Sequence, residues 1–327
     1  MKAILVDQEK HLHWQEVPDP VMGTEEVLVK IAAAALNRAD LMQREGDYPP
    51  PPGCPEWMGL EISGTIVQVG EEAGRKSNWK VGDKVCALLG GGGYAEYVTV
   101  KYDMLVPVPA NCSMVEAATL PEAFATAYLN MFIEGGIQPG NTLLVTGGNS
   151  GLASVMIRMA KAFGIRVITT VRSAKKAEAI RDLGADRIVN TSEEYLPDVL
   201  KQELEAGTGV DVAIDCLGSA VMGECLPYLN LRARWIMIAS LAGRDTQIDL
   251  KTIYVRNIRI IGSTLRSRPP QMKAEILSLL VRDVWPKIAS GEVKPTIYRV
   301  LPITQAEEAQ ELLDQGENVG KVVMTVN

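Results

Sequence analysis

The stretch Leu143-Leu-Val-Thr-Gly-Gly-Asn-Ser-Gly-Leu-Ala-Ser154 decides the fold of this chain. Its short apolar run predicts a buried strand, its glycines predict a sharp turn, and the periodic apolar residues from about Ser150 predict a helix. The first N–H groups of such a helix and the positive end of its dipole suit a pyrophosphate. The spacing Gly-x-x-x-Gly-x-Ala also occurs in ordinary strand–helix turns. The neighbouring segments must therefore decide between these two interpretations.

Strands and helices alternate on both sides of this turn. A helix over 121–131, with proline in its first turn, ends at Gly135-Gly136. The predicted strands that follow are 143–146, 166–171, 187–190, 210–216, 234–239 and 259–264, and the helices between them are 150–162, 174–183, 194–206 and 220–229. This order predicts a doubly wound parallel sheet with the glycine turn after its first strand, which is the context a nucleotide site needs.

The first third of the chain has a different pattern. Short alternating segments at 1–6, 26–32, 61–70, 84–89 and 94–100 predict a largely antiparallel β unit. The prolines of 48–53 predict a stiff extended loop, and Gly90–Gly93 predicts a mobile turn, with an anion nest as the alternative.

The tail after residue 264 is too short for a core of its own. Its expected helices (271–288 and 305–314) and strands (296–300 and 320–326) are therefore predicted to complete the β unit. We expect a β-rich domain over 1–120 and 265–327 with the parallel-sheet domain, 121–264, inserted into it.

Composition narrows the function classes. The 327 residues carry a net charge of -7, which argues against a general binder of nucleic acid, and no apolar run is long enough for a membrane span. The early acidic residue Asp7 argues against a signal peptide, so a cytoplasmic location is expected. The five cysteines lack metal-ligand or disulfide spacing, and the two histidines, His11 and His13, are expected at the surface.

The end of the second predicted strand bears on cofactor choice. NAD sites of this kind usually carry an acid about twenty residues after the glycines, to hold the ribose 2′-hydroxyl. This chain has Arg172, Ser173, Lys175 and Lys176 there instead. These donors favour the 2′-phosphate of NADP, although a solvated helix start would have a similar composition.

Several motifs carry a family resemblance across nearly the whole chain. They are Ala35-Leu-Asn-Arg-Ala-Asp-Leu-Met-Gln-Arg44, Tyr48-Pro-Pro-Pro-Pro-Gly53, Gly59-Leu-Glu-Ile-Ser-Gly64, Leu120-Pro-Glu-Ala123 and Ser263-Thr-Leu-Arg-Ser-Arg268. The chain resembles the zeta-crystallin-like quinone oxidoreductases of the medium-chain dehydrogenase/reductase superfamily, including their stress-inducible animal members. The resemblance implies an α/β fold, with a GroES-like β domain and an inserted Rossmann domain that binds NADP(H).

The resemblance also implies site residues. Asn37, Tyr48 and Asp40 would be catalytic. Cofactor-binding residues would be Tyr48, Thr126, Gly147, Gly148, Asn149, Ser150, Gly151, Leu152, Arg172, Ser173, Lys175, Ser219, Ser240, Leu241, Thr264, Leu265, Arg266 and Lys321. Simpler roles remain open, because Tyr48 could anchor its loop, Asn37 could cap a strand end and Arg266 could only pair with Asp40.

Zinc-dependent relatives in this superfamily place a cysteine where this chain has Asn37 and a histidine where it has Leu60. Neither residue can make that site, and the four-cysteine structural zinc cluster is missing. An acceptor that is already electrophilic needs no metal Lewis acid. We therefore expect zinc-independent NADPH:quinone reduction, with reduction of α,β-unsaturated aldehydes, ketones or enoyl thioesters as the alternative.

Two further expectations concern partners. A structural or RNA-binding role, as in some zeta-crystallin relatives, is the non-catalytic alternative, and the net charge and intact motifs argue against it. The apolar segment 257–263 would expose an unpaired sheet edge, so we expect a homodimer formed through it.

Overall fold

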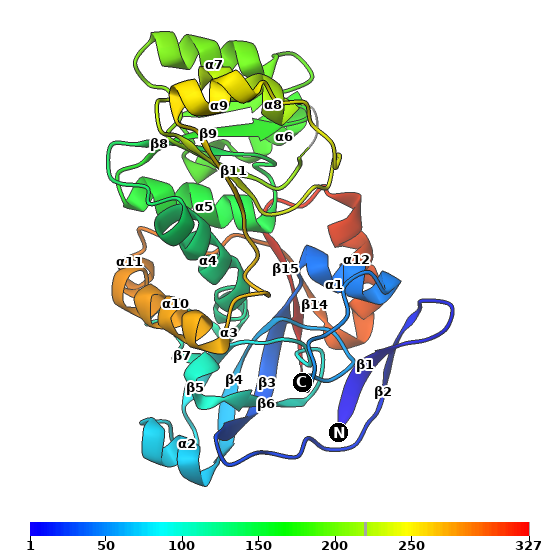
Figure 1. Ribbon diagram of the computed structural model, residues 1–327. Coiled ribbons are helices and arrows are strands. Elements are labelled where there is room, and N and C mark those ends of the chain that lie inside the picture. Colours follow the sequence, from blue (N-terminus) through cyan, green and yellow to red (C-terminus); the bar gives the residue numbers. More distant parts are fainter. Residues whose placement is uncertain (219–220, 327) are drawn as a thin grey trace. The chain divides into compact units, whose positions relative to one another are not determined.

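The computed structural model describes residues 1–218 and 221–326. The chain divides into two compact units. The first, here called the β unit, comprises Met1–Ala125 and Arg268–Asn327, and the second, the parallel-sheet unit, comprises Thr126–Ser267. Figure 1 shows the antiparallel strands of the β unit in blue and cyan, with the red C-terminal strand among them.

The β unit is built on one mixed sheet and a hairpin. Its strands are β1 (Lys2–Val6), β2 (Leu12–Glu16), β3 (Glu26–Ala35), β4 (Glu61–Val69), β5 (Lys84–Leu88), β6 (Tyr97–Lys101), β7 (Leu105–Pro107), β14 (Ile297–Pro302) and β15 (Lys321–Thr325). Seven of them form a sheet of order β14-β15-β3-β4-β5-β7, with β6 also paired to β3. Because β15 pairs antiparallel with β3, Val323 lies opposite Ala35, and the end of the chain meets the end of β3.

The core of the β unit follows the alternation of β3. Val27, Val29 and Ile31 are buried on one face of that strand, against Ile62 and Ile66 of β4. Burying each such side chain contributes about 1.5–3 kcal/mol to folding. The alternation that predicted an antiparallel unit is therefore the pattern that fills its core.

Helices cover parts of this sheet. They are α1 (Arg38–Glu45), α2 (Glu71–Lys76), α3 (Met114–Ala117), α10 (Pro270–Asp283), α11 (Trp285–Ala289) and α12 (Ala306–Gln315), with short 3₁₀ turns at Tyr102–Met104 and Ile303–Gln305. The single helix expected over 271–288 is wrong, because α11 begins separately at Trp285 and has Pro286, which lacks an N–H donor, in its first turn. Helix α1 was not anticipated, although Asn37 stands at its N-cap.

The glycine run 90–93 also corrects an expectation. Gly91, Gly92 and Gly93 are buried rather than forming a mobile turn. Gly59 has a φ of +107°, and a Cβ there would lie 2.6 Å from the Cα of Gly93. These glycines allow two backbone segments to pack in direct contact.

The parallel-sheet unit confirms the predicted fold class. Its strands are β8 (Thr142–Val145), β9 (Arg166–Val171), β10 (Arg187–Asn190), β11 (Val212–Asp215), β12 (Arg234–Met237) and β13 (Arg259–Gly262). They form a six-stranded, all-parallel sheet in the order β10-β9-β8-β11-β12-β13. The order reverses direction at β8, which is where doubly wound sheets bind ligands.

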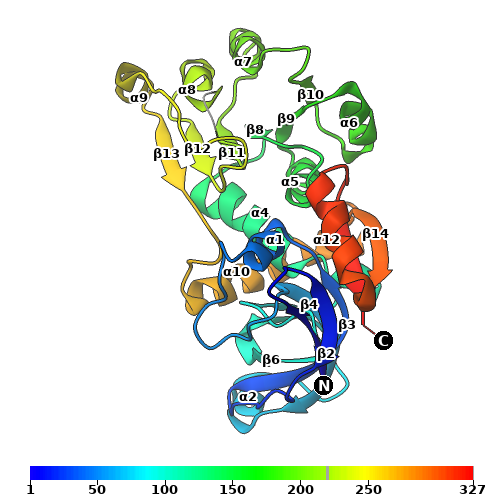
Figure 2. The same cartoon turned by 90° about the vertical axis from the view of Figure 1, so that its right-hand side faces the viewer.

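Helices flank this sheet on both faces, as Figure 2 shows with α7, α8 and α9 on one side and α5 on the other. Their bounds are α4 (Pro121–Tyr128), α5 (Gly151–Ala162), α6 (Ala174–Ala179), α7 (Leu196–Glu205), α8 (Val221–Cys225) and α9 (Leu250–Arg256), with 3₁₀ turns at Arg181–Leu183 and Leu226–Tyr228. The helix expected over 121–131 changes at Leu129 into a π-helix, Leu129–Glu134. No helix in the described part of the chain is long and apolar enough to cross a membrane.

Candidate functional site

The glycine loop, residues 146–150 between β8 and α5, requires glycine at two positions. Gly147 has a φ of +70°, a region that side chains disfavour. A Cβ on Gly148 would lie 2.4 Å from Oγ1 of Thr169 on the neighbouring strand β9. The loop can therefore lie flat against the end of β9.

The hydrogen bonds of this loop leave a defined pair of donors. Thr170 accepts the N–H of Gly147 with Oγ1 (3.2 Å) and that of Gly148 with its carbonyl (2.8 Å), and Ser150 Oγ caps the N–H of Ala153 (3.1 Å). The first N–H groups of a helix have no partner within it. In the part of the chain that the structure describes, the N–H groups of Gly151 and Leu152 have no hydrogen-bond acceptor.

A buried hydrogen-bond pair fixes the neighbouring strand ends. Thr146 Oγ1 donates to Oδ1 of Asp215 at the end of β11 (2.8 Å) and accepts the N–H of Cys216 (3.0 Å). Trp235 Nε1 donates to the other oxygen of Asp215 (3.3 Å). A small pocket beside this pair is lined by Val145, Thr146, Ser150, Leu152, Ala153, Met156, Ile214, Cys216 and Ile238. Sequence reasoning missed Asp215, whose side-chain partners Thr146 and Trp235 are far from it in the chain.

The basic residues expected to hold a 2′-phosphate follow β9 directly. Arg172 and Lys175 are exposed, and Ser173 caps α6 through a bond from the N–H of Lys176 (3.3 Å). Because β9 neighbours β8, these residues and the glycine loop lie at the same carboxyl edge of the sheet.

The other expected cofactor residues of this unit follow strands of the same sheet or lie in α4. Ser240 and Leu241 follow β12, and the N–H of Leu241 donates to the carbonyl of Cys216 (3.2 Å). Thr264, Leu265 and Arg266 follow β13, and Thr126 lies in α4. Ser219 lies outside the described residues.

The β unit holds a second group of expected site residues at the start of α1. Asp40 is fully buried, and its carboxylate accepts the N–H groups of Asn37 (2.7 Å) and Gly59 (3.1 Å) and the hydroxyl of Tyr94 (3.0 Å). Burial raises the pKa of Asp40 to about 6, against the lowering effect of these hydrogen bonds and of Lys321. The same burial raises the pKa of the Tyr94 phenol well above its usual value.

Asn37 is held by two charged side chains. Lys321 Nζ lies 2.7 Å from Asn37 Oδ1 and 2.7 Å from Glu61 Oε1, and Asn37 Nδ2 donates to the same Glu61 oxygen at 3.1 Å. The second oxygen of Glu61 accepts the N–H of Glu122 at the start of α4 (2.9 Å). We call Asn37, Glu61 and Lys321 the Asn37 triad.

The triad places one residue expected at the cofactor beside a residue expected to be catalytic. Lys321, expected at the cofactor, binds Asn37 and Glu61 within the β unit. Tyr48 is half-buried in the connection between α1 and β4. Glu61 was missed by sequence reasoning, and its only signal was its place in the Gly59-Leu-Glu motif.

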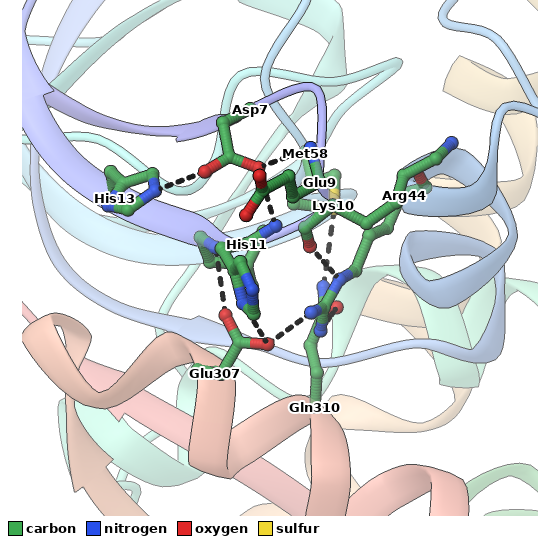
Figure 3. Close-up of polar contacts among 10 residues, drawn as sticks. Asp7, Glu9, Lys10, His11, His13, Arg44, Met58, Glu307 and Gln310 are labelled. Atoms are coloured by element: carbon green, nitrogen blue, oxygen red, sulfur yellow. Dashed lines mark hydrogen bonds and ion pairs between the residues drawn. The ribbon is translucent and has the colours of Figure 1, made fainter.

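The far end of α1 is fixed by a second polar cluster (Figure 3). Arg44 forms an ion pair with Glu307 of α12, and its Nε donates to the carbonyl of Lys10 (2.6 Å). The Nζ of Lys10 in turn donates to the carbonyls of Arg44 and Glu45 at the end of α1. His11 and His13 lie here and are 59% and 45% exposed, as expected for surface residues. The helix that carries Asn37 at its N-cap is thus anchored at both ends.

The described residues of this site offer no set of ligands for a metal ion. Asn37 is engaged by Lys321 and Glu61, and Leu60 is a buried leucine. Among the described residues no three His, Cys, Asp or Glu side chains lie together as a metal site would require. The residues present do not fit a catalytic zinc.

Comparison with known proteins fits this architecture. A family model for alcohol dehydrogenase GroES-like domains matches residues 23–110, and one for zinc-binding dehydrogenases matches residues 151–282. A quinone oxidoreductase-like protein 2 homolog of Nematostella vectensis is 30% identical over 310 residues, 93% of this chain and 82% of the relative. The chain belongs to the quinone oxidoreductases of the medium-chain dehydrogenase/reductase superfamily. It is therefore an oxidoreductase that uses a nicotinamide cofactor.

Other similar proteins within this superfamily differ in their named activities. Acryloyl-coenzyme A reductase of Sulfurisphaera tokodaii is 28% identical, with 99% of each chain covered. A mycobacterial protein solved in complex with NADPH has a TM-score of 0.86 and 25% identity, also with 99% of each chain covered. Membership alone therefore leaves the acceptor open.

Proposed function

We propose that the protein reduces quinones by direct hydride transfer from NADPH, without a metal. The observation that carries this proposal is the Asn37 triad, in which the amide of Asn37 stands where zinc-dependent relatives are expected to have a cysteine ligand and is held by the ammonium of Lys321 at 2.7 Å. Without a Lewis acid, the acceptor must already be electrophilic. A quinone meets that requirement.

The cofactor fits the parallel-sheet unit. The N–H groups of Gly151 and Leu152 would hold the pyrophosphate at the start of α5, a helix of 12 residues. Arg172, Ser173 and Lys175 would hold the 2′-phosphate of NADP, since Arg forms strong charge-assisted bonds with phosphate. Ser240, Leu241, Thr264, Leu265 and Arg266 would line the rest of the cofactor.

The bound cofactor supplies the hydride. Asn37 and Tyr48 orient the acceptor as hydrogen-bond donors, and neither is required to release a proton. The reduced quinone is a delocalised phenolate-like anion, which water can protonate. Asp40 holds the backbone of Asn37 in place through its bond to that N–H.

Reduction of activated alkenes is the second candidate. The similarity to acryloyl-coenzyme A reductase favours it. That reaction gives an enolate, which benefits more from a placed general acid than a phenolate does. The two candidates therefore differ in what they require of the Tyr48 hydroxyl.

Substitution of Tyr48 by phenylalanine tests this difference. For a quinone reductase, Tyr48→Phe should leave kcat largely intact and change mainly KM, because no general acid is removed. A positioned acid is worth about 10²- to 10⁴-fold. A loss of that size in kcat, with 2-enals as the better substrates, would establish the alkene reductase instead.

Two properties accompany the proposal. Elemental analysis of active enzyme should find no stoichiometric zinc, and loss of activity on chelation would refute this.

The edge strand β13 has the burial pattern of an unpaired strand, with Ile260 at 42% exposure, so a homodimer through it is proposed. Light scattering should give twice the chain mass of 35.5 kDa, and a monomer at micromolar concentration would contradict it.

A further inference from the structure

The chemistry of the triad fixes the orientation of the Asn37 amide. A lysine ammonium only donates hydrogen bonds and a carboxylate only accepts them. Lys321 must therefore face Oδ1 of Asn37, and Glu61 must face Nδ2, as the distances of 2.7 and 3.1 Å record. If the amide were flipped, its NH₂ would face the ammonium of Lys321 and its oxygen would face the carboxylate of Glu61, so neither hydrogen bond could form.

Burial separates the three members. Glu61 is 0% exposed and Lys321 is 5% exposed, whereas Asn37 is only partly buried. A bound molecule would therefore meet the triad through Asn37. The charges of Glu61 and Lys321 act from behind it.

One donor of Asn37 is poorly used. Its Nδ2 makes a 3.1 Å bond to Glu61, but its other contact, with the carbonyl of Ala35, is 3.4 Å long. Protein N–H···O bonds are normally about 2.7–3.2 Å long. The second N–H can therefore exchange this weak contact for a better acceptor.

We propose that Lys321 is a positioning residue for hydride transfer, holding and polarising the Asn37 amide so that its second N–H stabilises the oxyanion formed on the acceptor. The proposal rests on the proposed function, in which Asn37 contacts the acceptor. An ammonium on Oδ1 withdraws electron density from the amide and makes its N–H groups stronger donors. In a buried environment such a donor contributes more than it would in water.

The step balances without a further reactant. A C–H bond of the reduced cofactor would break, and its hydrogen and electron pair would form an O–H bond at one quinone carbonyl, while a π-electron pair moves through the ring onto the opposite carbonyl oxygen and leaves a phenolate. That oxygen then accepts the Asn37 N–H and finally takes a proton from water. The acceptor is reduced by two electrons and the cofactor is oxidised by two.

A structural role for the ion pair is the competing explanation, and a double variant separates the two. Lys321→Met alone leaves Glu61 buried without its counter-charge and can fail to fold. In the double variant Glu61→Gln/Lys321→Met the pair is neutral, so no lone charge is buried. Arg38→Met is the matched control, since Arg38 forms an exposed ion pair with Asp314 (2.7 Å) near the same helix start.

The experiment measures single-turnover hydride transfer, cofactor affinity and thermal melting for these variants. The double variant should melt close to wild type and bind NADPH unchanged, but transfer hydride roughly ten- to hundredfold more slowly, because the Asn37 donor remains but is no longer held and polarised by the ion pair. Lys321→Arg should recover most of the rate. A folded double variant with wild-type rate would overturn the proposal, and so would a rate loss explained by weaker NADPH binding.

A second readout needs no turnover. Titration of 4-nitrophenol, whose absorbance reports its ionisation, in the enzyme–NADP⁺ complex should give a lower pKa for the bound phenol with wild type than with the double variant. Equal values would overturn the role of Lys321. If wild type reduces 2-enals rather than quinones, the proposed function is wrong. The rate of hydride transfer to the enal is then compared between wild type and the double variant, and equal rates would overturn the role of Lys321.

Discussion

The glycine loop of the parallel-sheet unit and the Asn37 triad of the β unit are built in opposite ways. The loop is contiguous, and it presents backbone N–H groups whose directions are set by Gly147, Gly148 and the start of α5. The triad joins side chains from three strand or helix ends, with a sequence separation of 284 between Asn37 and Lys321. The glycine loop therefore requires that no side chain fill the space beside its backbone, whereas the Asn37 triad requires that its buried positive and negative charges stay paired.

This difference predicts different sensitivities. The loop presents backbone N–H groups, and the Ser150 side chain caps the start of α5. The triad tolerates no unbalanced charge, because Glu61 is fully buried.

Loss of the buried cation should be the most damaging change. Lys321→Met leaves Glu61 without its partner and should lower the free energy of unfolding by about 3–5 kcal/mol. Denaturation in urea measures this, and the exposed Arg38→Met should stay within about 0.5 kcal/mol of wild type. Equal stabilities for the two variants would show that the triad is not a buried charge pair in solution.

Asp40 should make the free energy of unfolding fall as pH rises, whereas most carboxylates in proteins have the opposite effect. Its pKa in the folded protein, about 6, lies above the usual value of an aspartate, so its stabilising contribution is fully present below that usual value and is lost as pH rises through 6. Relative to Asp40→Asn, wild type should lose about 2 kcal/mol between pH 4 and 7. Urea denaturation of both proteins across this range checks it, and a constant difference would refute the raised pKa.

Removal of a phosphate partner should leave stability unchanged and alter cofactor choice. Arg172 is exposed, so Arg172→Ala should weaken NADPH binding about ten- to hundredfold, the effect of losing one charge-assisted bond, without weakening NADH. Fluorescence titration with both cofactors measures this. Equal weakening of both would place Arg172 elsewhere on the cofactor.

Crowding of the loop should destabilise the protein less than loss of the buried cation does. In Gly148→Ala the new Cβ meets Thr169 Oγ1, which cannot move freely because it donates to the carbonyl of Val145 (2.8 Å). Overpacking of this kind costs about 1–3 kcal/mol. Gly74→Ala, in helix α2 with its nearest neighbour at 3.7 Å, should instead be neutral or stabilising. Thermal melting compares the two variants.

The sequence predicted the parts of the molecule that depend on local pattern. Short segments of sequence were enough to predict the alternation of β3, the apolar strands β8 and β11, and the glycine loop between β8 and α5. The fold class followed from their order. The families that match the chain agree with it.

The sequence did not predict what long-range pairing creates. Lys321 meets Asn37 only because β15 pairs with β3, and no local signal in either segment specifies that register. Helix α1 was missed because its residues read as a family motif rather than as a capped helix. The burial of Gly91–Gly93 likewise depends on contacts with Pro55 and Gly59, which lie in another segment.

The most direct test of the proposed function is a panel of quinones, 2-enals and enoyl thioesters, assayed with NADPH and with NADH on zinc-free enzyme. We expect the highest kcat/KM for a quinone with NADPH, with NADH at least about tenfold poorer because it lacks the 2′-phosphate that Arg172 would bind. A higher kcat/KM for a 2-enal or an enoyl thioester than for every quinone, or equal use of the two cofactors, would contradict it.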